Sequence, residues 1–297
     1  MVLDLKKEQF VPVLIILMFF WALMHPFSKM IVSDVSPALI AFLRNAIGAV
    51  VILGMIYFSK TKLTIDKKDI VPLVVLGIIG TALSSLLLFN GIGLSTATNA
   101  SILVNINPIF IAVLAPLIIH EKLDKKQIIG VVIAFLGMVL VTTNGMNLNQ
   151  MINDGYFIGN VILIGSAVCI TIYTIYGKKY VEKYGGIVAT FYTVLAGAAF
   201  LLFYTSASGE IGNIAKITID EWPIILYIGA VITGFIYVIW YKSIPFIGAS
   251  RASSFKLLIP VFAVIASIIL LGEVPSIFTI VGGAMVVAGL ALNQKLL

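Results

Sequence analysis

The sequence predicts an all-α polytopic membrane protein, with ten transmembrane helices arranged as two inverted five-helix repeats. The first reason is composition: of 297 residues, 61% are hydrophobic and only 11% are charged. Soluble domains carry roughly 45–50% apolar and about 25% charged residues. A chain this apolar has more hydrophobic surface than one globular core can bury, so we expect it to lie in a membrane.

The second reason is an internal duplication. The stretch from Asn99 to Val141 has a second version that begins at Arg251, 152 residues further along, and the two align without a gap. A proline, a glutamate and two glycines at fixed spacing inside apolar runs coincide by chance far less often than leucines do. We therefore infer a repeat. The matched pairs are Ala100/Ala252, Ser101/Ser253, Pro108/Pro260, Phe110/Phe262, Glu121/Glu273, Gly130/Gly282 and Gly137/Gly289.

Ten apolar segments are each about long enough to cross roughly 30 Å of hydrocarbon as a helix. Helices are expected because backbone amides in lipid need partners within their own segment. We find no small-residue cleavage site after the first run and expect a retained span, not a signal peptide. The expected spans are 10–32, 36–58, 70–93, 97–119, 126–143, 155–177, 186–207, 221–243, 249–271 and 276–294.

Basic residues lie mainly on one side of this arrangement. The termini and the even-numbered loops hold fifteen of them, whereas the opposite side has Lys29 and Lys216. Because positive residues mark the cytoplasmic side, both termini are predicted to be cytoplasmic, in a multi-pass protein of the cell inner (plasma) membrane. The second, fourth and sixth loops are expected to carry Lys60, Lys62, Lys67 and Lys68; Lys122, Lys125 and Lys126; and Lys178, Lys179 and Lys183.

Each half contains five spans, an odd number, so the two copies must face opposite ways. The expected repeats are residues 1–145, with spans one to five, and 153–297, with spans six to ten. Inverted repeats recur in secondary transporters, whose substrate site lies near the midplane between the halves. The first two spans match at an offset of 149, which pairs Lys29/Lys178, Phe42/Phe191, Gly48/Gly197 and Ala49/Ala198.

The chain resembles the drug/metabolite transporter (DMT) superfamily, in particular its EamA-like ten-span carriers, over nearly its whole length. The resemblance is carried by Trp21 in the first span, Arg44 in the second, and the Pro…Glu…Gly…Gly pattern that closes each half. The second half lacks the usual tryptophan near Tyr173. The resemblance implies a carrier; such carriers move amino acids, nucleotide sugars, phosphosugars, purines, choline or drugs.

Polar residues inside spans usually face a cavity or a partner helix. Lys256 lies four residues before Pro260, and its counterpart in the first repeat is Val104, so the fold does not require a lysine there. We expect Lys256 to attract an anionic group; the alternative is a lysine that snorkels to the cytoplasmic surface. Arg44 is expected to pair with an acidic residue or a helix end, which is a structural role.

Other candidates are amides, hydroxyls, aromatic rings and one imidazole. Pro108 frees backbone groups near Asn105, and Trp21 lies too deep in its span for an interfacial position. Rings would suit an apolar side chain or a cation. For His25, a satisfied structural histidine is the alternative. The cavity should be lined mainly by spans one, three, four, six, eight and nine. The substrate-binding set is Trp21, His25, Ser84, Asn90, Asn105, Tyr173, Tyr237, Tyr241 and Lys256.

A second set is expected to hold the fold together. Glu121 and Glu273 sit at helix ends and are expected to brace helical hairpins by bonding backbone amides at the start of the next helix. The spaced glycines suit close helix packing, within the chain or between two chains. The structural set is Arg44, Pro108, Glu121, Gly130, Gly137, Pro260, Glu273, Gly282 and Gly289.

These features predict a secondary transporter that exports amino acids or related small metabolites by alternating access. The alternative is an exporter or exchanger of organic cations or drugs, although no Asp or Glu lies in the middle of a span to bind a cation. A membrane-embedded enzyme is a remote alternative, since no His and carboxylate cluster or nucleophile motif is found. We expect no cofactor or metal, and a single cysteine, Cys169, fits that. Expected partners are a small-molecule substrate and the bilayer, not nucleic acid, in a monomer or homodimer.

Overall fold

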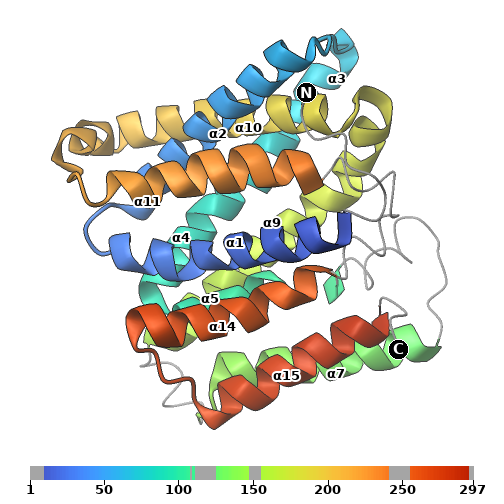
Figure 1. Cartoon of the computed structure of the whole chain (residues 1–297), viewed down its shortest axis with the longest axis vertical. Coiled ribbons are helices and arrows are strands. Elements are labelled where there is room, and N and C mark those ends of the chain that lie inside the picture. The colour runs from blue at the N-terminus through green and yellow to red at the C-terminus, as the bar shows by residue number, and fades with distance from the viewer. Residues whose placement is uncertain (1–9, 108, 111–124, 147–154, 241–254, 294–297) are drawn as a thin grey trace.

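The computed structural model describes residues 10–107, 109–110, 125–146, 155–240 and 255–293, and this part of the chain is a bundle of helices (Figure 1). Its elements are α1 (Phe10–Ile31), α2 (Pro37–Ser59), α3 (Lys67–Gly77), η2 (Ile78–Leu83), α4 (Ser84–Leu94), α5 (Ala97–Val104), α7 (Lys125–Thr143), α9 (Gly155–Tyr184), α10 (Gly186–Ala207), η3 (Glu210–Lys216), α11 (Trp222–Leu226), η4 (Tyr227–Ile236), η5 (Phe255–Leu257), α14 (Leu258–Leu271) and α15 (Ile277–Asn293).

The predicted fold class, an all-α polytopic membrane protein, is confirmed. Among the described residues, seven helices are long and apolar enough to span a membrane, and two shorter apolar helices match the expected ninth and tenth spans. The fourth expected span is represented by α5 and the residues up to Phe110. Large apolar side chains such as Phe203 and Ile269 are exposed on the outside of the bundle, where lipid would cover them. The repeat boundaries at 145 and 153 stay a prediction.

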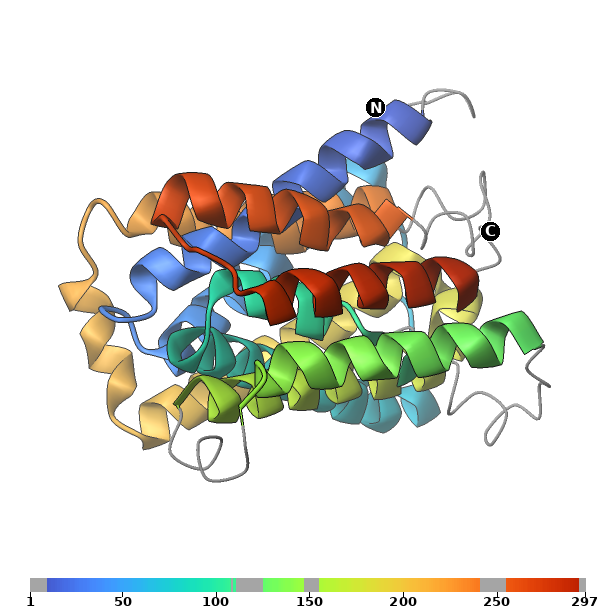
Figure 2. The same cartoon turned by 90° about the horizontal axis from the view of Figure 1, so that it is seen from below.

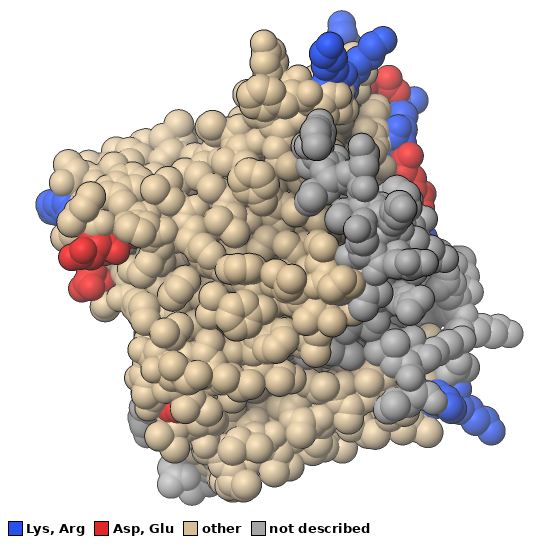
Figure 3. Space-filling view, viewed as in Figure 1, with Lys and Arg blue, Asp and Glu red and all other residues tan. Residues whose placement is uncertain are grey.

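Charged side chains gather at two opposite ends of the face in Figure 3, with an uncharged belt between them. The first turn of α1 and the last turn of α15 lie at the same end of the bundle in both ribbon views (Figure 1, Figure 2). This agrees with an even number of crossings, because an even number returns the chain to the side where it started.

The sixth helix is longer than the expected span 155–177. The helix α9 continues to Tyr184, so Lys178, Lys179 and Lys183 lie on its last turns and not in a loop. Tyr180 is buried there against the α3 helix, and the Lys183 ammonium lies 2.6 Å from carboxylate oxygens of both Asp66 and Asp69. The hydrogen bond from Lys183 lowers the pKa of Asp66 below its usual value. These contacts stabilise the last turns of α9, beyond the end of the apolar segment.

The α7 and α15 helices meet through glycines. A methyl group placed on Gly137 would lie 2.5 Å from the carbonyl oxygen of Gly282, and one on Gly289 would lie 2.5 Å from that of Gly130. The earlier glycine of each helix meets the later glycine of the other, so the helices are antiparallel. Because α7 and α15 are the repeat copies of each other, their antiparallel packing is what inverted repeats require.

The same symmetry relates the contacts of the α2 and α10 helices. Gly48 of α2 packs on the side chain of Thr233 in η4, and Gly197 of α10 packs on the side chain of Thr81 in η2. The two threonines are 152 residues apart and the two glycines 149 apart, the same offsets that relate the repeats. Both threonines lie in π-helical segments, which often mark functional sites. These paired contacts surround the centre of the molecule.

Candidate functional site

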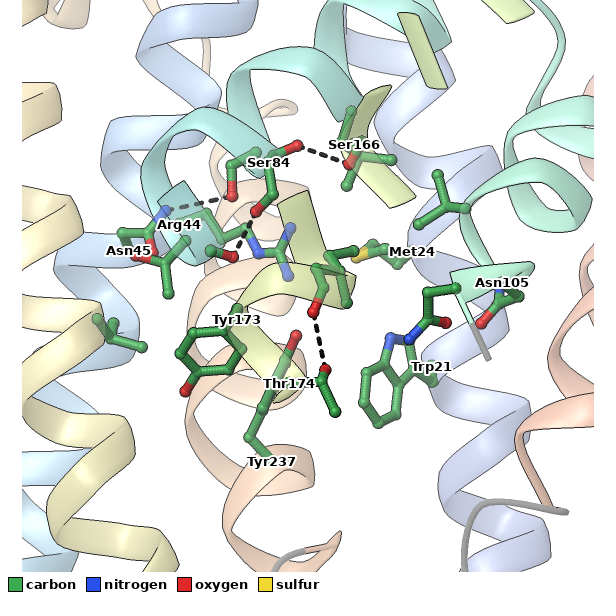
Figure 4. A pocket seen from close by; sticks show the side chains of 18 of the residues that line it. Trp21, Met24, Arg44, Asn45, Ser84, Asn105, Ser166, Tyr173, Thr174 and Tyr237 are labelled. Atoms are coloured by element: carbon green, nitrogen blue, oxygen red, sulfur yellow. Dashed lines mark hydrogen bonds between the residues drawn. The ribbon is translucent and has the colours of Figure 1, made fainter. Parts of the chain in front are cut away.

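A cavity of about 110 Å³ lies between the two repeats (Figure 4). The expected spans one, three, four, six, eight and nine all contribute to it, but α2 and α10, the second and seventh, do so as well. Their close packing on η4 and η2 brings them to the centre. The lining residues are Trp21, Met24, His25, Arg44, Asn45, Gly80, Thr81, Ser84, Ser85, Leu88, Val104, Asn105, Asn107, Ser166, Ile170, Tyr173, Thr174, Thr190, Val194, Tyr237 and Lys256.

Seven of the nine expected substrate-binding residues line this cavity. Asn90 does not: it is exposed, and its amide donates to the Leu86 carbonyl 2.7 Å away on its own helix. Asn90 follows the cavity-lining Leu88 by two residues on α4. Because successive helical residues turn by about 100°, its side chain points away from the face that lines the cavity. Tyr241 lies outside the described residues. The seven are Trp21, His25, Ser84, Asn105, Tyr173, Tyr237 and Lys256.

Lys256 lies in η5, just before α14, with its ammonium between two indole rings. The nitrogen is 5.1 Å from the ring centroid of Trp21 and 4.6 Å from that of Trp240. The two rings are 6.4 Å apart and nearly perpendicular. Among the described residues Lys256 has no hydrogen-bond or ion-pair partner, so the ring faces are what offsets its loss of water. Trp240 was not among the expected residues, because a tryptophan three residues from the end of the expected span 221–243 resembles an interfacial one.

Arg44 lies at the cavity and also bonds a residue of the other repeat. It is 7% exposed and lines the cavity, and its Nε donates to the Thr233 hydroxyl at 2.9 Å. Its guanidinium carbon lies 5.8 Å from the Phe89 ring centroid, and the Tyr237 hydroxyl is close by. Within the described part of the chain its partners are thus a hydroxyl and rings, not the acidic residue or helix end we expected. The guanidinium of Arg44 thus lies at the cavity with neutral partners among the described residues.

His25 lies one helical turn after Trp21 on the same face of α1. The imidazole is 1% exposed, and its Nδ1 has no hydrogen-bond partner among the described residues. The same holds for the Thr190 hydroxyl, which also lines the cavity. Buried polar atoms are nearly always paired, by protein, water or ligand. Either water or a polar solute in the cavity could pair these two atoms.

The opposite side of the cavity is built from hydroxyls and amides. The Ser166 hydroxyl donates to the Ser84 carbonyl at 2.8 Å (Figure 4). Next to the cavity, the hydroxyls of Tyr173 and Thr193 are 3.2 Å apart. Asn105 caps the end of α5, where its amide donates to the Ser101 carbonyl at 2.7 Å. Its carbonyl oxygen remains available to the cavity. This side is polar but uncharged.

Glu273 bonds backbone amides, as expected, but of a different helix. Its two oxygens accept from the amides of Ala97 and Thr98, at 2.8 and 3.0 Å, at the start of α5. The start of α15, the next helix, is capped by the Ser276 hydroxyl instead. A carboxylate is favourable at a helix N-terminus. Glu273 therefore joins the second repeat to the first and does not brace its own hairpin.

Lys29 completes this junction from α1. Its ammonium donates to the carbonyls of Ile92, Gly93 and Ser95 at 2.9, 3.1 and 2.6 Å, where α4 ends. The Pro260 ring is buried in the first turn of α14, which tolerates a missing amide hydrogen. Pro108 and Glu121 lie outside the described residues.

The fold and the central cavity define a multi-pass membrane transporter. A model of the EamA-like transporter family matches residues 10–143 and again residues 157–294. The chain belongs to this family, and both repeats carry the match.

Proteins of similar sequence are also named as transporters. The uncharacterized transporter YyaM of Bacillus subtilis is 29% identical over 265 residues, 88% of this chain and 86% of its own. An uncharacterized transporter of Archaeoglobus fulgidus is 26% identical over 276 residues, 93% of this chain and 94% of its own. A crystal structure at 19% identity superposes with a TM-score of 0.63, covering 96% of this chain and 95% of that one, which supports the fold. None of these names includes a substrate.

Proposed function

We propose that this protein is a secondary transporter that exports amino acids or related small carboxylate-bearing metabolites by alternating access. It acts in the cell inner (plasma) membrane with both termini in the cytoplasm. The observation that carries the proposal is the cavity between the repeats, whose lining includes Arg44 and Lys256. No Asp or Glu is among the described residues that line it. Two cations without an acidic partner favour an anionic group on the solute.

The size of the cavity favours small metabolites over drugs. Its volume is about 110 Å³, whereas drug-sized ligands occupy pockets of roughly 300–1,000 Å³. An organic cation would also have to lie beside Arg44 and Lys256 without a carboxylate to compensate. The volume thus counts against drugs, and the charge counts against organic cations.

A ligand screen and a transport assay test the proposal. Thermal shifts of the purified protein against amino acids, quaternary amines, purines and phosphosugars identify the ligand class. For transport, Lys256→Met in proteoliposomes should stay folded, with an equal or higher melting temperature, and lose transport of the carboxylate substrate. Lys256→Arg should keep part of the activity, because charge is retained while shape changes.

The matched control is Lys216→Met, which removes a positive charge from the exposed η3 segment, away from the cavity. It should transport at the wild-type rate. Wild-type transport by a well-folded Lys256→Met protein would show that this lysine is a bystander. Thermal shifts with quaternary amines alone would replace the proposal by cation transport.

A further inference from the structure

The basic residues of the cavity have neutral counterparts in the other repeat. At the repeat offsets, His25 corresponds to Thr174, Arg44 to Thr193 and Lys256 to Val104. The same family model matches both repeats, so the shared fold does not by itself require these basic groups. A charge inside a membrane is costly and is usually retained for function. The three residues are therefore best explained by a ligand.

These residues share one wall, which we call the basic wall: His25, Arg44 and Lys256, with Trp21 and Tyr237 between them. They come from α1, α2, η5 and the end of the eighth span, elements that pack on one another. The facing neutral wall comes from η2, α4, α9 and α10. The cavity is thus polarised from side to side, although the helices around it are arranged symmetrically.

Two rings lie between Arg44 and Lys256 on the basic wall. The Tyr237 hydroxyl lies close to the Arg44 guanidinium, and the Tyr237 ring is 5.1 Å from the Trp21 ring. Trp21 in turn lies 5.1 Å from the Lys256 ammonium. Arg44 and Lys256 therefore meet the cavity at two places, so one carboxylate on one of them leaves the other without a counter-charge.

The protein itself supplies little compensation. None of its 13 Asp and Glu residues lies in the middle of an expected span. Arg44 is held by a neutral hydroxyl, and Lys256 by indole rings. Leaving a buried charge without a partner is strongly unfavourable. A solute with two anionic groups removes this cost at both places at once.

We propose that the substrate is a small organic dianion, with one anionic group bound by Arg44 and the other by Lys256. This rests on the proposed carrier function and deepens it. His25 and the neutral wall hydrogen-bond the part of the molecule between the two anionic groups. The shared chemistry is two separated anionic groups, found in dicarboxylates and in phosphate monoesters that also bear a carboxylate.

The test compares succinate with succinamate, which has the same skeleton but only one charge. Binding to the purified full-length protein is measured by titration calorimetry. Succinate should bind about tenfold more tightly or better, because hydrogen bonds to charged groups are stronger than neutral ones. 2-Phosphoglycolate, which bears a carboxylate and a phosphate, and alanine form two further arms. They separate a phosphate-bearing substrate with two anionic groups from a dicarboxylate and from a zwitterion.

The variants remove one cation at a time. In Lys256→Met the ratio of succinamate to succinate dissociation constants should fall towards one, whereas Lys216→Met should keep the wild-type ratio. Arg44→Gln should lower the ratio as well; if it does not fold, Arg44→Lys, which keeps the charge, should retain part of the preference.

Each outcome separates the two proposals. Equal binding of succinate and succinamate by the wild-type protein, or alanine binding more tightly than either dianion, overturns the dianion and leaves the carrier of carboxylates standing. Binding of quaternary amines and of none of these anions overturns the carboxylate proposal itself. Tight binding of either dianion, with the ratio lost in Lys256→Met, supports both.

Discussion

The two repeats are alike where helices pack and unlike where they face the cavity. Gly48 and Thr233 in one contact have the equivalents Gly197 and Thr81 in the other, and the glycines of α7 and α15 pair across the same symmetry. By contrast, Arg44, which lines the cavity, corresponds at the repeat offset to the neutral Thr193. Where two backbones approach closely, few residue types fit, so the two repeats have the same residues at these contacts. A binding site for one asymmetric solute does not need to be symmetric.

The surroundings of Lys256 show the same contrast. Its counterpart is Val104, and the two tryptophans that hold it correspond to Ile170 and Leu88. The lysine and both of its rings therefore lie on the same side of the cavity, and the counterparts of all three are aliphatic residues. A cation and the groups that offset its desolvation have to occur together, which makes the basic wall one unit and not a set of separate substitutions.

The largest expected effect is on the shared packing. In Gly137→Leu the new side chain would collide with the α15 backbone, since even a methyl group there lies 2.5 Å from the Gly282 carbonyl oxygen. Backbone cannot move aside cheaply, and overpacking commonly costs about 1–3 kcal/mol or more. We expect most of the monodisperse folded protein to be lost in size-exclusion chromatography.

The control is Gly54→Leu on α2, because nothing lies within 4 Å of a methyl group at Gly54. It should leave the folded yield unchanged. If Gly137→Leu were folded as well as Gly54→Leu, the α7–α15 contact would not be the tight junction described above.

The second largest effect is expected from a variant that moves the lysine from one repeat to the equivalent position of the other. The double variant Lys256→Val with Val104→Lys keeps the net charge but moves the cation to a place where Ile170 and Leu88 replace the indole rings. Inserting a lysine costs roughly 2.5–3.5 kcal/mol near mid-membrane, and here no ring offsets it. We expect a lower melting temperature and at least about a tenfold loss of transport. Wild-type transport by this variant would mean that the side of the cavity is immaterial.

Glu273→Gln should reduce folded yield more than substrate affinity. Glutamine keeps one oxygen but loses the charge that two α5 amides bind, and hydrogen bonds to charged groups contribute about 1.5–3 kcal/mol. The exposed Glu182→Gln on α9 is the control and should be neutral. The repeat predicts the same result for Glu121→Gln. Stable variants of both that no longer respond to a pH gradient would instead make these glutamates coupling groups.

The smallest expected effect is a difference in substrate binding between variants of the two equivalent threonines. Thr81 donates to the carbonyls of Gly77 and Thr193, at 2.8 and 3.2 Å, whereas Thr233 accepts from Arg44. Thr233→Val and Thr81→Val should both lose about 1 kcal/mol of stability. Thr233→Val should also weaken substrate binding severalfold, because Arg44 loses its support. Equal affinities of the two variants in calorimetry would show that Thr233 does not position Arg44.

Most of the fold could be read from the chain alone. The apolar content, the spacing of the spans and the gapless offset of 152 predicted the helical bundle and its inverted halves, because lipid allows few structures and a repeat constrains them further. The polar residues of the cavity were also visible, since Lys256, His25 and Trp21 stand out within apolar runs.

Side-chain partners could not be read in this way. That Lys256 meets Trp240, that Arg44 rests on Thr233, and that Glu273 reaches α5 all depend on which helices are neighbours. The helices are apolar on nearly every face, so periodicity does not show which face turns inward; Asn90 was misplaced for this reason. The sequence shows that the basic residues have neutral counterparts in the other repeat. Only tertiary packing, which selects the neighbours, brings those basic residues together at one cavity.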